Sequence, residues 1–119
     1  MATRIEIGID STRPEDLAPF WAEALGYTIG DMDRAGTYLD LVPPDAHLPV
    51  VYLQRVPEPK MVKNRLHLDL RTADPEETIA RLLALGATKL GAPHTGSEGG
   101  WWQVMSDPEG NEFCVCNCD

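Results

Sequence analysis

The sequence has no long hydrophobic run. None of its 119 residues lies in a segment near the roughly 18 apolar residues that a membrane-spanning helix needs. Residues 1–6 also lack the apolar centre of a secretion signal. We therefore expect a cytoplasmic protein with no membrane partner. The length suffices for one domain with its own core, and an apolar content of 43% is ordinary for a globular chain.

Basic residues are scarce. The chain has 10 Lys and Arg against 19 Asp and Glu, which gives a net charge of −9, and the basic residues form no cluster. A nucleic-acid backbone requires a basic patch, so a nucleic-acid partner is excluded. The acidity mainly favours solubility and identifies no partner by itself.

Cysteine is also rare, with three residues that alternate near the C-terminus: Cys114, Cys116 and Cys118. On a strand they would share one face, with neighbouring Cα atoms roughly 6.5–7 Å apart, which suits a disulfide poorly. In a reducing compartment we expect free thiols. Small buried side chains on a last strand are the simpler interpretation, and a soft-metal site is the alternative.

The chain is organised around the segment RLHLDLR at residues 65–71. Its three leucines alternate with polar residues, so the segment is predicted to be a strand with one apolar and one polar face. The apolar face requires a cover, and a helical pattern follows directly. The polar face carries His67, Asp69 and two arginines, and either water or a cavity must accommodate them.

A similar arrangement stands near the N-terminus, about sixty residues earlier, so the chain contains an internal repeat. Ile5, Ile7 and Ile9 alternate with polar residues, and a helical pattern follows, as it does after 65–71. Proline, acidic residues and a final glycine mark both helices. The predicted helices are 14–25 and 75–85, and the predicted strands are 3–9, 27–32, 37–42, 50–56, 65–71, 87–91, 101–105 and 112–117.

These elements predict an α+β fold made of two βαβββ modules within a single domain, 1–119. Module one spans about 1–57 and module two about 64–119, with a short polar linker between them. We expect one curved, mixed, eight-stranded sheet around a cleft, with both helices on the outer face. In the second helix, Ile79, Leu82 and Leu83 are predicted to be buried.

Alternation along the strands selects the residues that face the cleft. Glu6 and His67 project there as an acid–base pair, and so do Gln54 and Cys114. A structural histidine that pairs with Glu6 or Asp69 is the alternative for His67.

Three further residues are candidates for ligand contacts. Tyr38 and Asp40 share one face of their strand. Trp101 and Trp102 face opposite sides, and the register with Gln103 and Met105 assigns Trp101 to the cleft, as an aromatic wall for a flat, apolar or cationic ligand. His47 and His94 are predicted to be exposed loop residues.

Five segments in this order resemble the glyoxalase/bleomycin-resistance/dioxygenase group, the vicinal oxygen chelate superfamily, and most of all its small glyoxalase-like domain proteins. They span almost the whole chain: DLAPFW (16–21), LGY (25–27), RLHLDL (65–70), LLALGA (82–87) and DPEGNEFCV (107–115). The resemblance implies two βαβββ modules around a cup and a homodimer.

The resemblance also implies four metal-ligand positions, which fall on Glu6, Gln54, His67 and Cys114. Only His67 keeps a usual ligand type, and the mixture suits neither hard nor soft cations cleanly. We therefore expect no resident metal. The alternative is Zn, Ni, Mn or Fe held by Glu6, His67 and Cys114.

Two functions follow. The first is a lyase, isomerase or dioxygenase-like enzyme that uses Glu6 and His67 on a small oxygenated molecule, with or without a metal. Classical glyoxalase I activity is not expected, because only one of the four metal-ligand positions, His67, keeps a usual ligand type. The second is a binding protein of the bleomycin-resistance type, which would sequester a planar or cationic drug without chemistry. Fold alone does not decide between them.

Overall fold

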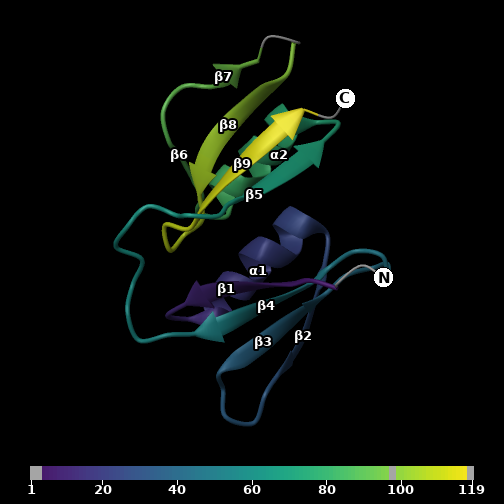
Figure 1. Cartoon of the computed structure of the whole chain (residues 1–119), viewed down its shortest axis with the longest axis vertical. Helices are drawn as coiled ribbons and strands as arrows, with labels where there is room; N and C mark the ends of the chain where they lie inside the picture. The colour runs from purple at the N-terminus through teal and green to yellow at the C-terminus, as the bar shows by residue number, and fades with distance from the viewer. Residues whose placement is uncertain (1–3, 97–98, 118–119) are drawn as a thin grey trace. The chain divides into compact units, whose positions relative to one another are not determined.

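The computed structural model describes residues 4–96 and 99–117, and the chain divides into two compact units between Pro59 and Lys60 (Figure 1). This division lies inside the predicted linker. Each unit contains a strand, a helix and then further strands, so the predicted α+β fold of repeated βαβββ type is confirmed. The strands form two sheets, of four and five strands, whereas a single sheet of eight strands was predicted.

The first unit contains a four-stranded sheet and one helix. The strand order is β1-β4-β3-β2, and the first and last strands, β1 and β4, are parallel neighbours. The other pairs in this sheet are antiparallel. The elements are β1 (Glu6–Ser11), α1 (Pro14–Leu25), β2 (Thr28–Met32), β3 (Tyr38–Val42) and β4 (Val50–Arg55).

Helix α1 supplies the apolar cover of this sheet. Pro14 begins it, and two acidic residues in the first turn face the positive end of the helix dipole. Gly26 ends it in the left-handed conformation at φ 71°, as the sequence predicts. Leu17, Phe20 and Trp21 are buried against the inward residues of β3 and β4, which leaves the opposite face of the sheet to polar and aromatic side chains.

The second unit repeats this plan with one additional strand. The order β5-β9-β8-β6 again makes the first and last strands parallel neighbours. Strands β6 and β7 each have two residues and both pair with β8. The elements are β5 (Leu68–Thr72), α2 (Pro75–Ala84), β6 (Thr88–Lys89), β7 (His94–Thr95), β8 (Trp101–Ser106) and β9 (Glu112–Asn117).

Helix α2 packs on one face of this second sheet (Figure 1). Ile79 and Leu82 are buried as predicted, but Leu83 is 40% exposed because it lies beyond the narrow apolar stripe of a short helix. Met105 and Phe113 complete the core from the sheet. Among the described residues, no helix is long and apolar enough to cross a membrane.

Strand β5 begins three residues later than predicted. The expected alternation holds from Leu68 onwards, but Leu66 is 88% exposed and lies before the strand. The Asn64 side chain explains this, because its amide donates to the backbone carbonyls of Leu66 and Glu112, at 3.1 and 3.0 Å. At the start of β9, the Asn64 side-chain amide thus takes the place of a backbone hydrogen bond between β5 and β9. His67 is the residue directly before β5.

Candidate functional site

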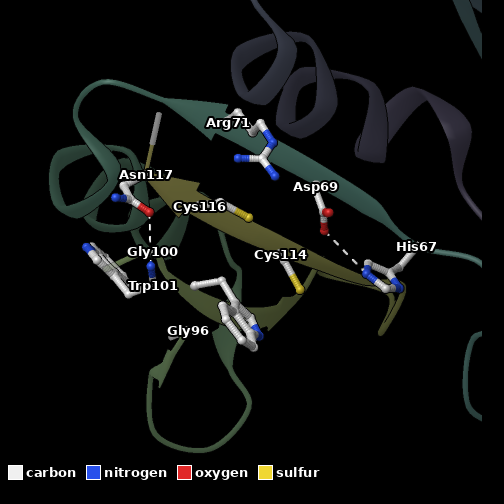
Figure 2. A pocket seen from close by; sticks show the side chains of 10 residues that line it. His67, Asp69, Arg71, Gly96, Gly100, Trp101, Cys114, Cys116 and Asn117 are labelled. Carbon is white, nitrogen blue, oxygen red and sulfur yellow. Dashed lines mark hydrogen bonds and ion pairs between the residues drawn. The ribbon is translucent and has the colours of Figure 1, made fainter. Parts of the chain in front are cut away.

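The face of the second sheet that α2 does not cover contains a hollow of about 690 Å³ (Figure 2). All of its lining residues belong to the second unit, so the hollow is a feature of that unit alone. They are His67, Asp69, Arg71, Gly96, Gly100, Trp101, Trp102, Cys114, Cys116 and Asn117. Imidazole, carboxylate, guanidinium, thiol and indole groups therefore line one cavity.

Strand register explains why these side chains gather. Residues that pair across neighbouring strands point to the same side of a sheet. One row runs from Asp69 on β5 to Cys114 on β9. The next runs from Arg71 to Cys116, then to Trp102 on β8 and on to β7. Alternation along β5 and β9 places both rows on the uncovered face.

His67, Asp69 and Cys114 form the most concentrated chemical cluster of the hollow. Nε2 of His67 lies 3.3 Å from Oδ1 of Asp69, and one potential ligand atom from each of the three residues lies within 4.8 Å of the other two. The side chains of His67 and Asp69 are about half exposed, whereas Cys114 is buried. Of the partners predicted for a structural His67, the structure shows Asp69.

Both described cysteines are held as neutral thiols. Burial, the nearby Asp69 carboxylate and Cys116 raise the pKa of Cys114 to about 11. Burial and then Asp69 also raise the pKa of Cys116. The two share one face of β9 as free thiols, as the sequence predicts, and Cys118 lies outside the described residues. At neutral pH, the floor of the hollow therefore carries no thiolate charge.

Side chains of the segment before His67 contact Glu112, the first residue of β9. Glu112 accepts a hydrogen bond from Lys63, and Lys60 lies 3.7 Å from its other oxygen. These lysines lower the pKa of Glu112, mainly through the hydrogen bond from Lys63. Because Asn64 binds the carbonyl of the same residue, side chains of the linker fix the approach of the chain to His67.

Both adjacent tryptophans line the hollow, whereas the sequence assigned only Trp101 to it. Register places Trp102 on the face of Cys116, where its ring stacks on His94 with centroids 5.4 Å apart and planes at 13°. Trp101 lies on the opposite side with Gln103 and also lines a smaller hollow beside Ile79. The backbone N–H of Trp101 donates to Asn117 Oδ1 at 3.0 Å (Figure 2).

His94 differs from the exposed loop residue predicted for it. It is exposed but belongs to β7, and its partner Trp102 fixes its ring by stacking. The sequence signal that was missed is the pairing of β7 with β8, since two-residue strands are too short to show an alternating pattern.

The other predicted ligand contacts lie on the uncovered face of the first sheet. Tyr38 and Gln54 are cross-strand partners, as are Asp40 and Tyr52. The rings of Tyr38 and Tyr52 meet edge to face with centroids 5.9 Å apart. Tyr52 was not among the predicted residues, although the same alternation of β4 that selected Gln54 includes it.

Glu6, the predicted partner of His67, lies at the start of β1 and pairs with Val50. It is exposed, and it belongs to the first unit whereas His67 belongs to the second. Their acid–base pairing therefore stays a prediction. Within the second unit, Asp69 is the carboxylate next to His67.

The cluster His67, Asp69 and Cys114 fits a zinc-type ion by its chemistry. Imidazole nitrogen, carboxylate oxygen and thiolate sulfur are the three donors that proteins use for Zn²⁺. Ligand atoms within 4.8 Å of one another require only small movements to share one ion. The carboxylate of this cluster is Asp69, whereas the sequence predicted Glu6 as the carboxylate ligand beside His67 and Cys114. Binding would require Cys114 to lose its proton.

Comparisons with known proteins agree with this fold. The glyoxalase-like domain family matches residues 6–116. A glyoxalase/bleomycin resistance protein/dioxygenase family enzyme from Burkholderia phytofirmans is similar, with a TM-score of 0.72 and 19% identity over 94% of this chain and 95% of that one. A search of curated protein sequences found no match.

Two proteins that are named for antibiotics share the fold. A bleomycin-binding protein in complex with bleomycin has a TM-score of 0.67 and 20% identity, covering 99% of this chain and all 100% of that one. The fosfomycin resistance protein FosX from Mesorhizobium loti has a TM-score of 0.75 and 12% identity, covering 100% and 94%. The family match spans nearly the whole sequence, and the chain therefore belongs to the glyoxalase-like domain family.

Proposed function

We propose that the protein binds a small organic molecule in the hollow on the β5–β9–β8 face. The observation that supports this most directly is the chemistry of its lining: Trp102 offers a flat apolar surface, while His67, Asp69 and Arg71 offer hydrogen bonds around it. Binding pockets in proteins combine such an apolar wall with a few polar groups that orient the ligand. That the bleomycin-binding relative holds a small ligand on the same fold is consistent with this proposal.

The experiment is a thermal-shift and fluorescence screen with small aromatic and oxygenated molecules of different charge. We expect hits whose binding is lost in Trp102→Ala. Leu83→Ala is the matched control, because Leu83 is a partly exposed apolar residue on α2, away from the hollow. Binding that survives Trp102→Ala unchanged would contradict this location.

Acid–base catalysis is a second candidate, supported by the contact between His67 and Asp69. A carboxylate oxygen 3.3 Å from Nε2 orients the imidazole ring. His67 is half exposed, so a ligand in the hollow reaches the ring, and His67 then takes or gives a proton. Glu6 is proposed as a second acid–base group on the basis of the repeat alone. The reaction would be of the lyase, isomerase or dioxygenase-like kind.

A divalent ion at His67, Asp69 and Cys114 is compatible with this second candidate. When bound, it would polarise an oxygen atom of the ligand. The chain's own contribution would be to hold the three donors and to keep Arg71 and Trp102 around the ligand. Elemental mass spectrometry of tag-free protein, purified without chelator, is the test. We expect any stoichiometric Zn, Ni, Mn or Fe to disappear in His67→Ala, and retention of the metal in that variant would exclude this cluster.

Sequestration without chemistry is the alternative to catalysis. Product analysis of each hit after long incubation distinguishes them, because a binding protein returns the ligand unchanged. A cytoplasmic homodimer is proposed from the sequence and from the family resemblance, and light scattering at several concentrations tests the oligomeric state.

A further inference from the structure

We infer that the hollow selects a planar aromatic carboxylate, which Arg71 binds by its carboxylate while the ring packs against Trp102. This inference rests on the proposed function, because it names the chemical class of ligand for the same site. It derives from the cross-strand row Arg71, Cys116, Trp102 and His94, which lies on one face of four strands.

The shape of this row favours a flat ligand of about one ring. Arg71 and Trp102 belong to strands β5 and β8, which are separated only by β9, so their backbones lie about 9.5 Å apart. Between them lies Cys116, whose short side chain is buried. The row thus has long side chains, Arg71 and Trp102, on either side of the short side chain of Cys116, which leaves space above Cys116.

The charge at one end of the row favours an anion. The Arg71 guanidinium lines the hollow from β5 (Figure 2). It already interacts with other groups of the chain, but its five N–H donors allow a further bidentate contact with a carboxylate. An arginine–carboxylate pair of this geometry is stronger than an ordinary exposed ion pair.

The only carboxylate among the described lining residues is Asp69, and it is already engaged. His67 Nε2 lies 3.3 Å from its Oδ1, and the Cys114 sulfur lies within 4.8 Å of that carboxylate. Cys116, which lies between Arg71 and Trp102 in the row, is a buried free cysteine. Along the row from Arg71 through Cys116 and Trp102 to His94, an incoming anion therefore meets no carboxylate, although the whole chain carries a net charge of −9.

The opposite end of the row favours an aromatic ring. Trp102 is half-buried, and its stacking on His94 at an interplanar angle of 13° fixes the plane of the indole. A fixed, partly open indole is a good surface for a second flat ring. Gly96 contributes to this fit, since a Cβ at that position would lie 3.7 Å from the Trp102 ring and would narrow the space beside it.

The experiment compares four ligands that differ in one property each: benzoate, its neutral amide benzamide, the cation benzamidine and the non-planar anion cyclohexanecarboxylate. Binding is followed by NMR on the tryptophan indole N–H signals, with Trp102 assigned from Trp102→Phe. We expect benzoate to bind about tenfold or more tightly than benzamide, because a charge-assisted bidentate contact is lost in the amide. Benzamidine and cyclohexanecarboxylate should both bind more weakly than benzoate.

Variants of Arg71 test the assignment of the anion contact. In Arg71→Gln, benzoate should lose its advantage over benzamide, while benzamide keeps its affinity, which also shows that the variant is folded. Arg71→Lys should restore only part of the advantage, because lysine offers a point charge without the planar fork. The control is Arg81→Gln, which makes the same charge change on α2 and should leave the preference intact.

The outcomes separate this inference from the proposed function. If benzamidine or benzamide binds as tightly as benzoate, or if Arg71→Gln leaves the preference for benzoate unchanged, the inference is wrong while the small-molecule site stands. If none of the four ligands shifts the Trp102 signal but other molecules from the broader screen do, the ligand class is again wrong. If no molecule of any charge binds, both proposals fail.

Discussion

Alkaline pH should destabilise the fold through one buried thiol. Cys114 is only 6% exposed, and its pKa is raised from 9.0 to about 11, first by burial and then by the charge of Asp69. A raised pKa means that the folded state holds the proton more tightly than the unfolded chain does. The resulting stabilisation is complete below pH 9.0 and is lost as pH rises towards about 11.

The size of the effect follows from the shift in pKa. Since one pKa unit corresponds to about 1.36 kcal/mol, a rise from 9.0 to about 11 corresponds to about 3 kcal/mol of unfolding free energy. This is a large fraction of the stability of a small protein, which is typically about 5–15 kcal/mol.

The assay is urea unfolding of the wild type and of Cys114→Ala at pH values from about 8 to about 11, with reductant and a chelator present. Lysines and tyrosines also titrate in this range, and Tyr27 has a raised pKa, but they do so in both proteins. The cavity in the alanine variant lowers its unfolding free energy by the same amount at every pH. The difference in unfolding free energy between the two proteins should therefore shrink by about 3 kcal/mol across the range. If the two curves stay parallel, the thiol is not buried beside a carboxylate as described.

Three other changes test the scaffold of the site. Glu112→Gln removes a carboxylate whose pKa Lys63 and Lys60 lower, so the wild type should lose stability as pH falls below 4.5 and the variant should lose less, as measured by acid unfolding. Gly26→Ala should cost about 1 kcal/mol in urea unfolding, because φ is 71° at this helix end and only glycine adopts it without strain. Asp107→Ala should cost about 2–3 kcal/mol in the same assay, since this buried carboxylate accepts two backbone N–H groups that would lose their partner. Equal acid sensitivity in the first case, or unchanged urea midpoints in the others, would contradict these roles.

The elements of the fold were predictable wherever hydrophobic periodicity was strong. The helices that begin at Pro14 and Pro75 show clear start signals, and the repeat of strand and helix predicts two similar units. The exact start of β5 was not predictable, because the alternation continues back to Arg65 without interruption. The later start of β5 results from the side-chain amide of Asn64, which donates a hydrogen bond to the backbone carbonyl of Glu112. A contact between residues so far apart in the sequence cannot be recognised from a local hydrophobic pattern.

The sequence predicted which strand face carries the candidate site, but it did not predict which side chains contact each other there. Alternation placed His67 and Cys114 among polar neighbours, and the structure collects both in one hollow. The prediction chose Trp101 alone, whereas the hollow is lined by Trp101 and Trp102. It relied on the register of Gln103 and Met105, which are both buried in the core of the unit. A glutamine in a strand suggests an open face, but here its amide donates to the carbonyls of Gly91 and Val104 and is satisfied inside.

The bond between Asn117 and the N–H of Trp101 has a practical consequence for handling the protein. Asn117 ends β9, pairs with Thr72 and lines the hollow, so the polypeptide leaves its last strand at the rim of the cavity. A tag added at the C-terminus would follow only two residues after Asn117, a side chain that lines the proposed binding site. Binding measurements are therefore best made on protein tagged at the other terminus.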